Sequence, residues 1–243
     1  MATLKDAAAY GANLIAHRLG YEVRPWRVDP KAEGFIGYVE QAARLGMDVN
    51  DWQEQALGWL PARPTLERVV FPHLRPDGQD VVVELGAGTG RFSRHLAARL
   101  TDGELRLVDH SPFVVDFLRR YFRANPRVSV HLNDGASLPF TDGGWADLVF
   151  SAGTLIALSL GTIDLYLREF RRVLKPGGCA IFDYIDPATP EGWQHLTSQS
   201  AYLRTVYTYH AASAIERVCV EAGFQVGDRH QEGKSTYVCL WNQ

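Results

Sequence analysis

Short apolar runs alternate with amphipathic segments along the chain from residue 81 onward. The runs VVVEL (81–85), ELRLVD (104–109) and ADLVFS (146–151) have the composition of strands that are covered on both faces. Two further strand-like runs occupy residues 127–132 and 179–185. Strands that alternate with helices in this way predict a doubly wound, mostly parallel α/β sheet with right-handed crossovers.

The segments between these runs have helical patterns. Residues 91–100 place apolar side chains at helical spacing, and residues 162–174 form an amphipathic stretch that the sequence KPGG stops. In the segment SPFVVDFLRRYF, Ser111 is the expected N-cap and Pro112 the first helical residue. These helices are the predicted crossovers of the sheet.

The end of the chain predicts a different kind of pairing. Residues 213–224 have a helical pattern, and residues 224–230 and 235–242 have strand patterns. The four residues QEGK that separate the two strands are too few for a parallel crossover. We therefore expect the last strand to be antiparallel.

The first quarter of the chain differs from the rest. We interpret residues 1–68 as a helical cap or substrate lid on a core of residues 69–243, although these helices could instead cover one edge of the sheet. The cap contains aromatic residues that could close over an acceptor or simply pack in its core, namely Tyr10, Tyr21, Trp26, Phe35, Tyr38, Trp52 and Trp59.

Composition narrows the class of protein. The chain has 243 residues, of which 46% are hydrophobic and 22% charged, as in soluble globular proteins. Its formal net charge of -3 argues against a nucleic-acid substrate, without excluding a local basic patch. The sequence has neither an apolar run of membrane-spanning length nor a signal-peptide pattern, so we expect a cytoplasmic protein without a membrane partner. The pattern carries no information on oligomeric state.

The three cysteines do not predict a metal centre or a disulfide framework. Cys179, Cys219 and Cys239 are far apart in the sequence and form no C-x-x-C pair. Two lie in strand-like segments and one in a helix-like segment, which favours small buried apolar side chains. The histidines also lack the spacing of metal ligands, so no metal is expected.

A glycine-rich turn follows the first predicted strand. Glu84 is followed by Gly86, Gly88 and Gly90, whereas Arg91 occupies the position at which a nicotinamide-binding turn has its third glycine. No Walker phosphate-binding loop is present, and we interpret GKST (233–236) as a hairpin turn. The turn therefore matches neither common class of dinucleotide or nucleotide site.

The chemistry of this turn favours a ligand with charges of both signs. Glycines allow the backbone to approach a ligand closely, and the helix that begins near Arg91 presents free N–H groups. The carboxylate of Glu84 would be a poor neighbour for a diphosphate. A ligand that carries both an ammonium and a carboxylate group would suit the site better.

The segment VVVELGAGTG resembles the first motif of the class I S-adenosylmethionine-dependent methyltransferases, E/D-x-G-x-G-x-G. By this resemblance Asp109 binds the ribose hydroxyls, and Asp134 with Gly135 in NDGASLPF lies by the adenine. The segments ADLVFSAGTL and EFRRVLKPGGCAIFDY continue the likeness, which spans residues 81–240 and implies a seven-stranded, Rossmann-like sheet with an antiparallel C-terminal strand. The residues implied to bind the cofactor are Glu84, Gly86, Ala87, Gly88, Gly90, Asp109, His110, Asp134, Gly135 and Ser151.

Some of these residues have simpler interpretations. Taken alone, Asp109 could be a solvated carboxylate, Asp134 could cap its own turn, and His110 could be an exposed histidine.

The resemblance implies transfer of a methyl group from the sulfonium of S-adenosylmethionine to an acceptor. We expect a small-molecule acceptor that is methylated on oxygen, with nitrogen or carbon as alternatives. A base is needed only if the acceptor must lose a proton. The candidate catalytic residues are His210 and Tyr184; Asp186 is expected to face the same pocket, and His195 is a weaker candidate base.

Two other functions fit the same sequence. A protein or RNA methyltransferase should have a basic or peptide-sized groove. A non-enzymatic protein that binds S-adenosylmethionine would keep Glu84, the glycines and Asp109 without turnover. The sequence does not distinguish binding from catalysis.

Overall fold

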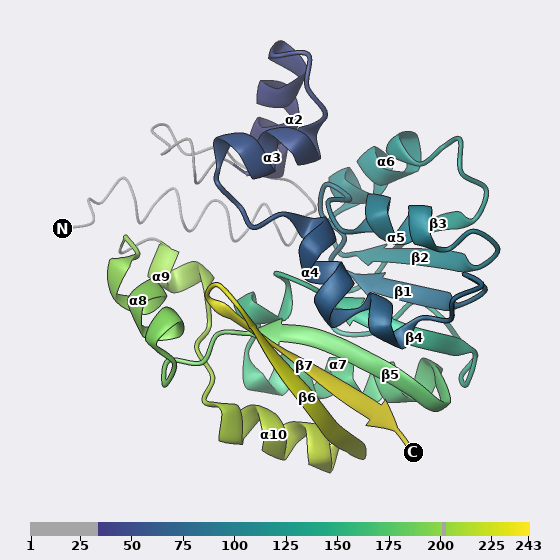
Figure 1. Cartoon of the computed structure of the whole chain (residues 1–243), viewed down its shortest axis with the longest axis vertical. Helices are drawn as coiled ribbons and strands as arrows, with labels where there is room; N and C mark the ends of the chain where they lie inside the picture. The colour runs from purple at the N-terminus through teal and green to yellow at the C-terminus, as the bar shows by residue number, and fades with distance from the viewer. Residues whose placement is uncertain (1–33, 201–202) are drawn as a thin grey trace.

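The computed structural model of the chain describes residues 34–200 and 203–243, and its centre is a seven-stranded sheet (Figure 1). The order of the strands is β3-β2-β1-β4-β5-β7-β6. Their bounds are β1 Val81–Leu85, β2 Glu104–Asp109, β3 Val128–Leu132, β4 Ala146–Ser151, β5 Leu174–Tyr184, β6 Phe224–Glu232 and β7 Ser235–Asn242. The first five strands pair in parallel, which confirms the doubly wound sheet predicted from the alternation.

The two C-terminal strands form the predicted antiparallel hairpin. β7 pairs antiparallel with both β5 and β6, and only Gly233 and Lys234 separate the two strands of the hairpin. The GKST segment is therefore a hairpin turn, as the sequence predicted. Gly233 has a positive φ of 56°, which glycine adopts without steric cost.

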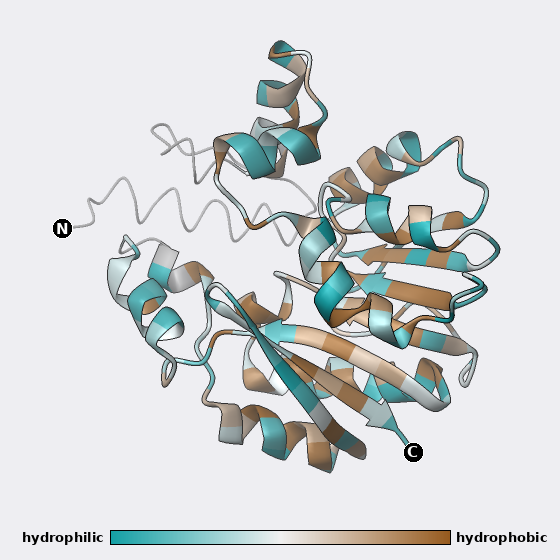
Figure 2. Cartoon of the chain, viewed as in Figure 1, coloured by the Kyte–Doolittle hydropathy of each residue, from teal (hydrophilic) through white to brown (hydrophobic). Residues whose placement is uncertain are grey.

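Helices cover both faces of the sheet. Their bounds are α2 Phe35–Arg44, α3 Val49–Ala56, α4 Ala62–Val69, η2 Phe71–His73, α5 Ser93–Arg99, α6 Pro112–Tyr121, η3 Leu155–Ala157, α7 Leu160–Val173, α8 Pro190–Ser198, α9 Leu203–Val206 and α10 Ala212–Glu221. On one face, α7 and α10 pack with residues such as Val83 and Phe182. On the other, α4, α5 and α6 pack with residues such as Val82 and Ile181. Apolar residues follow the central strands (Figure 2), as expected for strands buried on both faces.

Two local details differ from the sequence prediction. β5 begins at Leu174, directly after α7, because Leu174 already pairs with Ala146 of β4. Ser111 is the N-cap residue of α6, as predicted, but its side chain makes no capping hydrogen bond. Its backbone N–H instead donates to Asp109 Oδ1 at 2.9 Å, so the carboxylate at the end of β2 organises this turn.

The described part of the N-terminal segment packs on the core. Leu66 and Val69 of α4 lie in the same apolar cluster as Val82 and Leu96. α2 and α3 share a smaller cluster around Trp52. The division into a cap of residues 1–68 and a core of residues 69–243 stays an interpretation. Residues 1–33 of the chain lie outside the described part, and with them Tyr10, Tyr21 and Trp26. Within residues 34–200 and 203–243, every helix is too short or too polar to cross a membrane.

Candidate functional site

A cavity of about 480 Å³ lies at the carboxyl ends of β1, β4 and β5. Open α/β sheets bind their ligands in this position. The wall is formed by the glycine turn after β1, by residues 152–154 after β4, by the end of β5 and by the tip of the β6–β7 hairpin. Phe35, Tyr38 and Trp59 also line it, whereas Trp52 packs against Tyr38 with ring centroids 5.8 Å apart. Three of the cap aromatics therefore reach the cavity.

The glycine turn depends on its glycines in two physical ways. Gly86, Gly88 and Gly90 all have positive φ, at 74°, 54° and 82°. A Cβ atom on Gly86 would lie 1.8 Å from Oγ1 of Thr154, so the turn also needs the missing side chain. Gly86, Ala87 and Gly88 line the cavity, whereas Gly90 is not among its lining residues. Gly90 instead faces the ring of Phe122.

Glu84 places a buried carboxyl group in the wall of the cavity. Its exposed fraction is 2%. Its Oε2 atom and the hydroxyl of Ser93 are both buried without a well-aligned hydrogen-bond partner among the described residues. Burial raises the pKa of Glu84 to about 8, because a carboxylate loses its hydration there, although Ser93 and Arg91 each act to lower this pKa. A buried acceptor atom without a partner is costly unless a ligand supplies a donor. A cationic group or an N–H donor of a ligand would satisfy this atom.

Asp109 stands at the end of β2 beside the glycine turn. Its Oδ2 accepts a hydrogen bond from the backbone N–H of Gly88 at 3.4 Å, and its other oxygen accepts one from Ser111. Burial raises the pKa of this carboxyl group. The structure thus brings Asp109 to the turn, although it is not among the residues that line the described cavity. Its binding of ribose stays a prediction.

The remaining predicted cofactor residues follow or end β2, β3 and β4 and are not among those that line the described cavity. The Asp134 carboxylate is exposed and accepts hydrogen bonds from Ala136 and Ser137, which lowers its pKa. A Cβ atom added to Gly135 would lie 4.0 Å from the Cβ atom of His110, so the two residues are neighbours. Ser151 is buried and donates to the carbonyl of Leu85 at 3.0 Å, so its hydroxyl fastens the ends of β4 and β1 together.

The structure corrects the expected position of Tyr184. Its side chain is 1% exposed and packs in the apolar cluster with α7 and α10. Successive side chains of a strand point to opposite faces, so Asp183 faces the cavity and Tyr184 faces away from it. Sequence alternation was the signal that separates these two neighbours. Tyr184 therefore contacts the core instead of an acceptor.

The other expected acceptor residues also have structural partners. His210 Nε2 lies 3.1 Å from the carbonyl oxygen of Leu158, and the imidazole is not part of the described cavity wall. His195 Nδ1 lies 3.0 Å from the hydroxyl of Tyr209, and burial lowers the pKa of His195 to about 4. Asp186 is not part of the described cavity wall either, and its carboxylate accepts hydrogen bonds from the N–H groups of Ala188 and Ala212.

Several charged or aromatic residues line the cavity without having been predicted to bind the cofactor or act in catalysis. Among them are Trp59, Arg91, Asp183, Tyr207 and Lys234. The Asp183 carboxylate accepts hydrogen bonds from the N–H of Gly153 at 2.8 Å and from the hydroxyl of Ser235 at 2.7 Å. Lys234 Nζ lies 5.3 Å from the ring centroid of Tyr207, and burial lowers the pKa of this lysine.

Comparison with known proteins gives the site its class. Residues 82–178 match the family model described as a methyltransferase domain. The chain is 32% identical over 108 residues to a malonyl-[acyl-carrier protein] O-methyltransferase of Methylococcus capsulatus, covering 44% of this chain and 38% of that protein. It is 29% identical over 157 residues to a 23S rRNA (guanine(748)-N(1))-methyltransferase of Streptomyces fradiae, covering 62% and 51%. The chain thus spans between about a third and a half of these relatives.

Solved structures agree on the fold. A SAM-dependent methyltransferase from Aquifex aeolicus superposes with a TM-score of 0.61 at 18% identity, over 89% of this chain and all of that one. Residues 82–178 therefore form a methyltransferase domain in a chain with the fold of the S-adenosylmethionine-dependent methyltransferases, and S-adenosylmethionine is the cofactor that this class of domain implies.

The residues present fit this cofactor. Its amino-acid end carries an ammonium and a carboxylate, and the cavity wall offers the unpaired Glu84 oxygen and the guanidinium of Arg91. Arg91 is held over the rings of Trp59 and Phe92 and donates to the carbonyl of Leu60 at 2.7 Å. Glu84 and Arg91 are therefore the groups of this wall that would hold the two charges.

Proposed function

We propose that this protein transfers the methyl group of S-adenosylmethionine to an oxygen of a small-molecule acceptor. The observation that carries the proposal is the cavity of about 480 Å³, which joins the glycine turn to Trp59, Tyr207 and Lys234. Cavities of small-molecule sites span roughly 300–1,000 Å³. Since the cofactor occupies part of this space, the remainder suits a small acceptor better than a folded macromolecule.

The groups of this chain would act mainly by positioning. Bound S-adenosylmethionine supplies an electrophilic methyl group. Holding an acceptor in line with a reacting group contributes about 7–11 kcal/mol in favourable systems. Trp59 and Tyr207 offer flat apolar surfaces for an acceptor, and Arg91 and Lys234 offer positive charge. An acceptor with an apolar or aromatic body and a polar oxygen fits this lining.

Lys234 is our candidate for the proton acceptor if the acceptor is a hydroxyl group. Burial lowers the pKa of its ammonium, and the buried Asp183 opposes this shift. Among the described residues, no carboxylate lies within ion-pair distance of its Nζ atom. A buried amine without a close carboxylate loses its proton more readily than an exposed lysine. His210 stays a second candidate, although its position outside the described cavity wall does not favour it.

The relatives include methyltransferases that act on oxygen and on nitrogen, and RNA is the second candidate acceptor. The M. capsulatus relative is named as an O-methyltransferase and the S. fradiae relative as an rRNA N-methyltransferase. A net charge of -3 makes an RNA surface the less favourable partner, because RNA binding relies on clustered positive charge.

The test uses S-adenosylmethionine with a radiolabelled methyl group and an extract divided into small metabolites, RNA and protein. We expect label in the small-metabolite fraction. Label confined to RNA or protein would reject the small-molecule acceptor, and binding without product in any fraction would leave a non-enzymatic binding protein. Alkali then releases the label from the purified product if the product is a methyl ester. N-methyl, C-methyl and ether products keep the label, and mass spectrometry distinguishes an ether from the other two.

A pair of variants tests the base. We expect Lys234→Met to lower turnover about 10²–10⁴-fold, the usual contribution of a general base. His210→Ala should leave turnover within about threefold, since its Nε2 atom is engaged by the Leu158 carbonyl. Calorimetric affinity for S-adenosylmethionine serves as the folding control for both. The reverse pattern would return the role to His210.

A further inference from the structure

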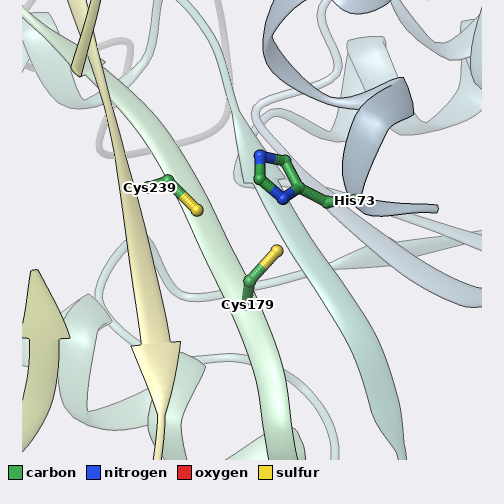
Figure 3. Close-up of side chains that lie close together, drawn as sticks. All are labelled: His73, Cys179 and Cys239. Carbon is green, nitrogen blue, oxygen red and sulfur yellow. The ribbon is translucent and has the colours of Figure 1, made fainter. Parts of the chain in front are cut away.

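Three side chains with metal-binding atoms meet at a place separate from the cofactor cavity. His73 of η2, Cys179 of β5 and Cys239 of β7 place one imidazole nitrogen and two sulfur atoms within 4.8 Å of one another. In Figure 3 the two sulfur atoms and the imidazole ring point toward a common space. The three residues are not among those that line the described cavity.

The geometry of the sheet argues against a disulfide at this place. Cys239 lies opposite Ile181, and Cys179 lies opposite Trp241, so the two cysteines are diagonal neighbours on one face of the sheet. Diagonal neighbours have Cα atoms about 7–8 Å apart, beyond the roughly 4.4–6.8 Å of a relaxed disulfide. Both cysteines are free thiols in the structure. The pair therefore holds two sulfurs near each other without bonding them.

The surroundings hold the three groups in place and leave one side accessible. The two cysteines are 2% exposed and belong to the apolar cluster beneath α4 and α5. The ring of His73 packs edge-on against Trp241, with centroids 5.4 Å apart, and is only half-buried. A bound ion would thus have three protein ligands and an approach from the His73 side.

We propose that His73, Cys179 and Cys239 bind one Zn²⁺ ion. Two thiolates and one imidazole are ligands that thiophilic ions such as Zn²⁺ select, whereas Mg²⁺ and Ca²⁺ require oxygen ligands. Zinc–sulfur bonds of about 2.3 Å and zinc–nitrogen bonds of about 2.0–2.1 Å require only small side-chain movements from atoms already within 4.8 Å. Water completes the tetrahedron on the half-exposed side. Binding releases the two thiol protons to solvent.

Such an ion would connect segments that are distant in the sequence. η2 lies between α4 and β1 in the chain, whereas β5 and β7 are neighbouring strands that come much later in the sequence. A metal bond between them would fasten the end of the N-terminal segment to the sheet. The proposal thus predicts a stabilising ion and does not depend on the identity of the methyl acceptor.

The test measures zinc binding by the full-length, reduced protein after treatment with a chelator. We expect one equivalent of Zn²⁺ to bind with a Kd of about 10 nM or tighter in competition with a chromophoric chelator. Co²⁺ should give a thiolate-to-metal charge-transfer band. Cys179→Ser, Cys239→Ser and His73→Asn should each weaken zinc binding at least about 100-fold, because losing a ligand should cost more than the roughly 10–100-fold that follows from losing a group that only supports a ligand.

A matched control is available in the third cysteine. Cys219 is also buried, but it lies on α10 and outside the group of three. Cys219→Ser should therefore keep the full equivalent of zinc. Loss of binding in this control to the same degree, or absence of binding by the wild-type protein, would overturn the proposal.

A second measurement decides the case in which the cysteine variants do not fold. Wild-type protein is treated with a thiol alkylating agent with and without Zn²⁺, and the modified cysteines are identified by mass spectrometry. We expect zinc to slow modification of Cys179 and Cys239 at least about tenfold and to leave Cys219 unchanged. If Zn²⁺ leaves the rate of modification of Cys179 and Cys239 unchanged, as it should for Cys219, the proposed site is overturned.

Discussion

At the scale of single residues, Glu84 is held in surroundings that favour its neutral form. Its carboxyl group is buried in the cavity wall, and its Oε2 atom lacks a described partner. The buried carboxyl group destabilises the free protein, and a cationic ligand bound to it would remove this destabilisation. Binding groups often reduce stability in this way when their ligand is absent. The carboxyl group of Asp109 beside it differs, because Gly88 and Ser111 donate to it.

We expect Glu84→Gln to weaken S-adenosylmethionine binding and to stabilise the unliganded protein. The amide keeps the shape but removes the charge that would pair with the ammonium, so the Kd should rise about 10–100-fold, as for loss of a charge-assisted hydrogen bond worth roughly 1.5–3 kcal/mol. The Tm of the free protein at pH 8 should rise by about 2–8 °C if the relief is on the order of 1–2 kcal/mol. Calorimetry and thermal unfolding measure the two effects. Glu104→Gln, a change on an exposed side chain of β2, is the control, and an unchanged Kd in Glu84→Gln would contradict the assignment.

The same residue predicts a pH dependence. The folded-state pKa of Glu84 is about 8 and its ordinary value is 4.5, so the folded protein binds this proton more tightly than the unfolded chain. The stabilisation from the proton is complete below pH 4.5 and is lost as pH rises through 8. The Tm of the free protein should therefore fall as pH rises from 4.5 to 8, and the affinity for S-adenosylmethionine should rise over the same range. In Glu84→Gln both slopes should become smaller; an equal slope in the two proteins would assign the effect to another group.

At the scale of the element, the glycine turn combines two separate requirements. Gly86 needs both its positive φ and the absence of a Cβ atom, because Thr154 lies directly against it. Gly88 also has a positive φ, but nothing lies within 4 Å of its Cβ position. The two glycines of one motif thus serve the fold and the ligand to different degrees.

This difference predicts different outcomes for two alanine substitutions. We expect Gly86→Ala to destabilise the protein by about 2–5 kcal/mol, from left-handed strain and overpacking together. Gly88→Ala should cost only about 1–2 kcal/mol from its φ, while its methyl group enters the space of the cofactor. Urea unfolding and S-adenosylmethionine binding measure both variants. Equal losses of stability would show that the contact with Thr154 relaxes easily.

At the scale of the whole molecule, the N-terminal segment is fastened to the glycine turn. The hydroxyl of Thr89 donates to Oε1 of Gln53 at 2.7 Å, and both side chains are buried. Arg94 donates to Asp51 at 2.6 Å beside this contact. Arg68 and Glu232 form a bidentate pair that connects α4 with the hairpin tip. The glycine turn, the N-terminal segment and the hairpin therefore meet around one cavity.

We expect the buried contact between Gln53 and Thr89 to be measurable by a double-mutant cycle. Gln53→Leu leaves the Thr89 hydroxyl without its partner and should destabilise the protein by about 1–3 kcal/mol, with weaker S-adenosylmethionine binding. Adding Thr89→Val should recover most of this loss, because removing both partners is nearly neutral. Urea unfolding of the four proteins measures the coupling. Additive effects would mean that the cap and the turn are not coupled through this bond.

Local pattern was sufficient for the elements and their order. The apolar runs at 81–85, 104–109 and 146–151 became β1, β2 and β4, because continuous apolar sequence reports burial on both faces. The two-residue turn at Gly233 dictated an antiparallel hairpin for steric reasons. The glycine motif predicted a tight turn after β1, since each of its glycines adopts a backbone conformation that other residues rarely adopt.

Tertiary structure alone decided which side chains share a space. Side chains of β5 alternate between the two faces of the sheet, so Asp183 faces the cavity and Tyr184 packs in the core. The β6–β7 hairpin brings Lys234 to the same cavity. Sheet register placed Cys179 and Cys239 diagonally and η2 added His73 beside them, although 106 and 60 positions separate these three residues in chain order. Periodicity describes how one segment faces the interior. Contacts between distant segments depend on strand order and register, which no local pattern contains.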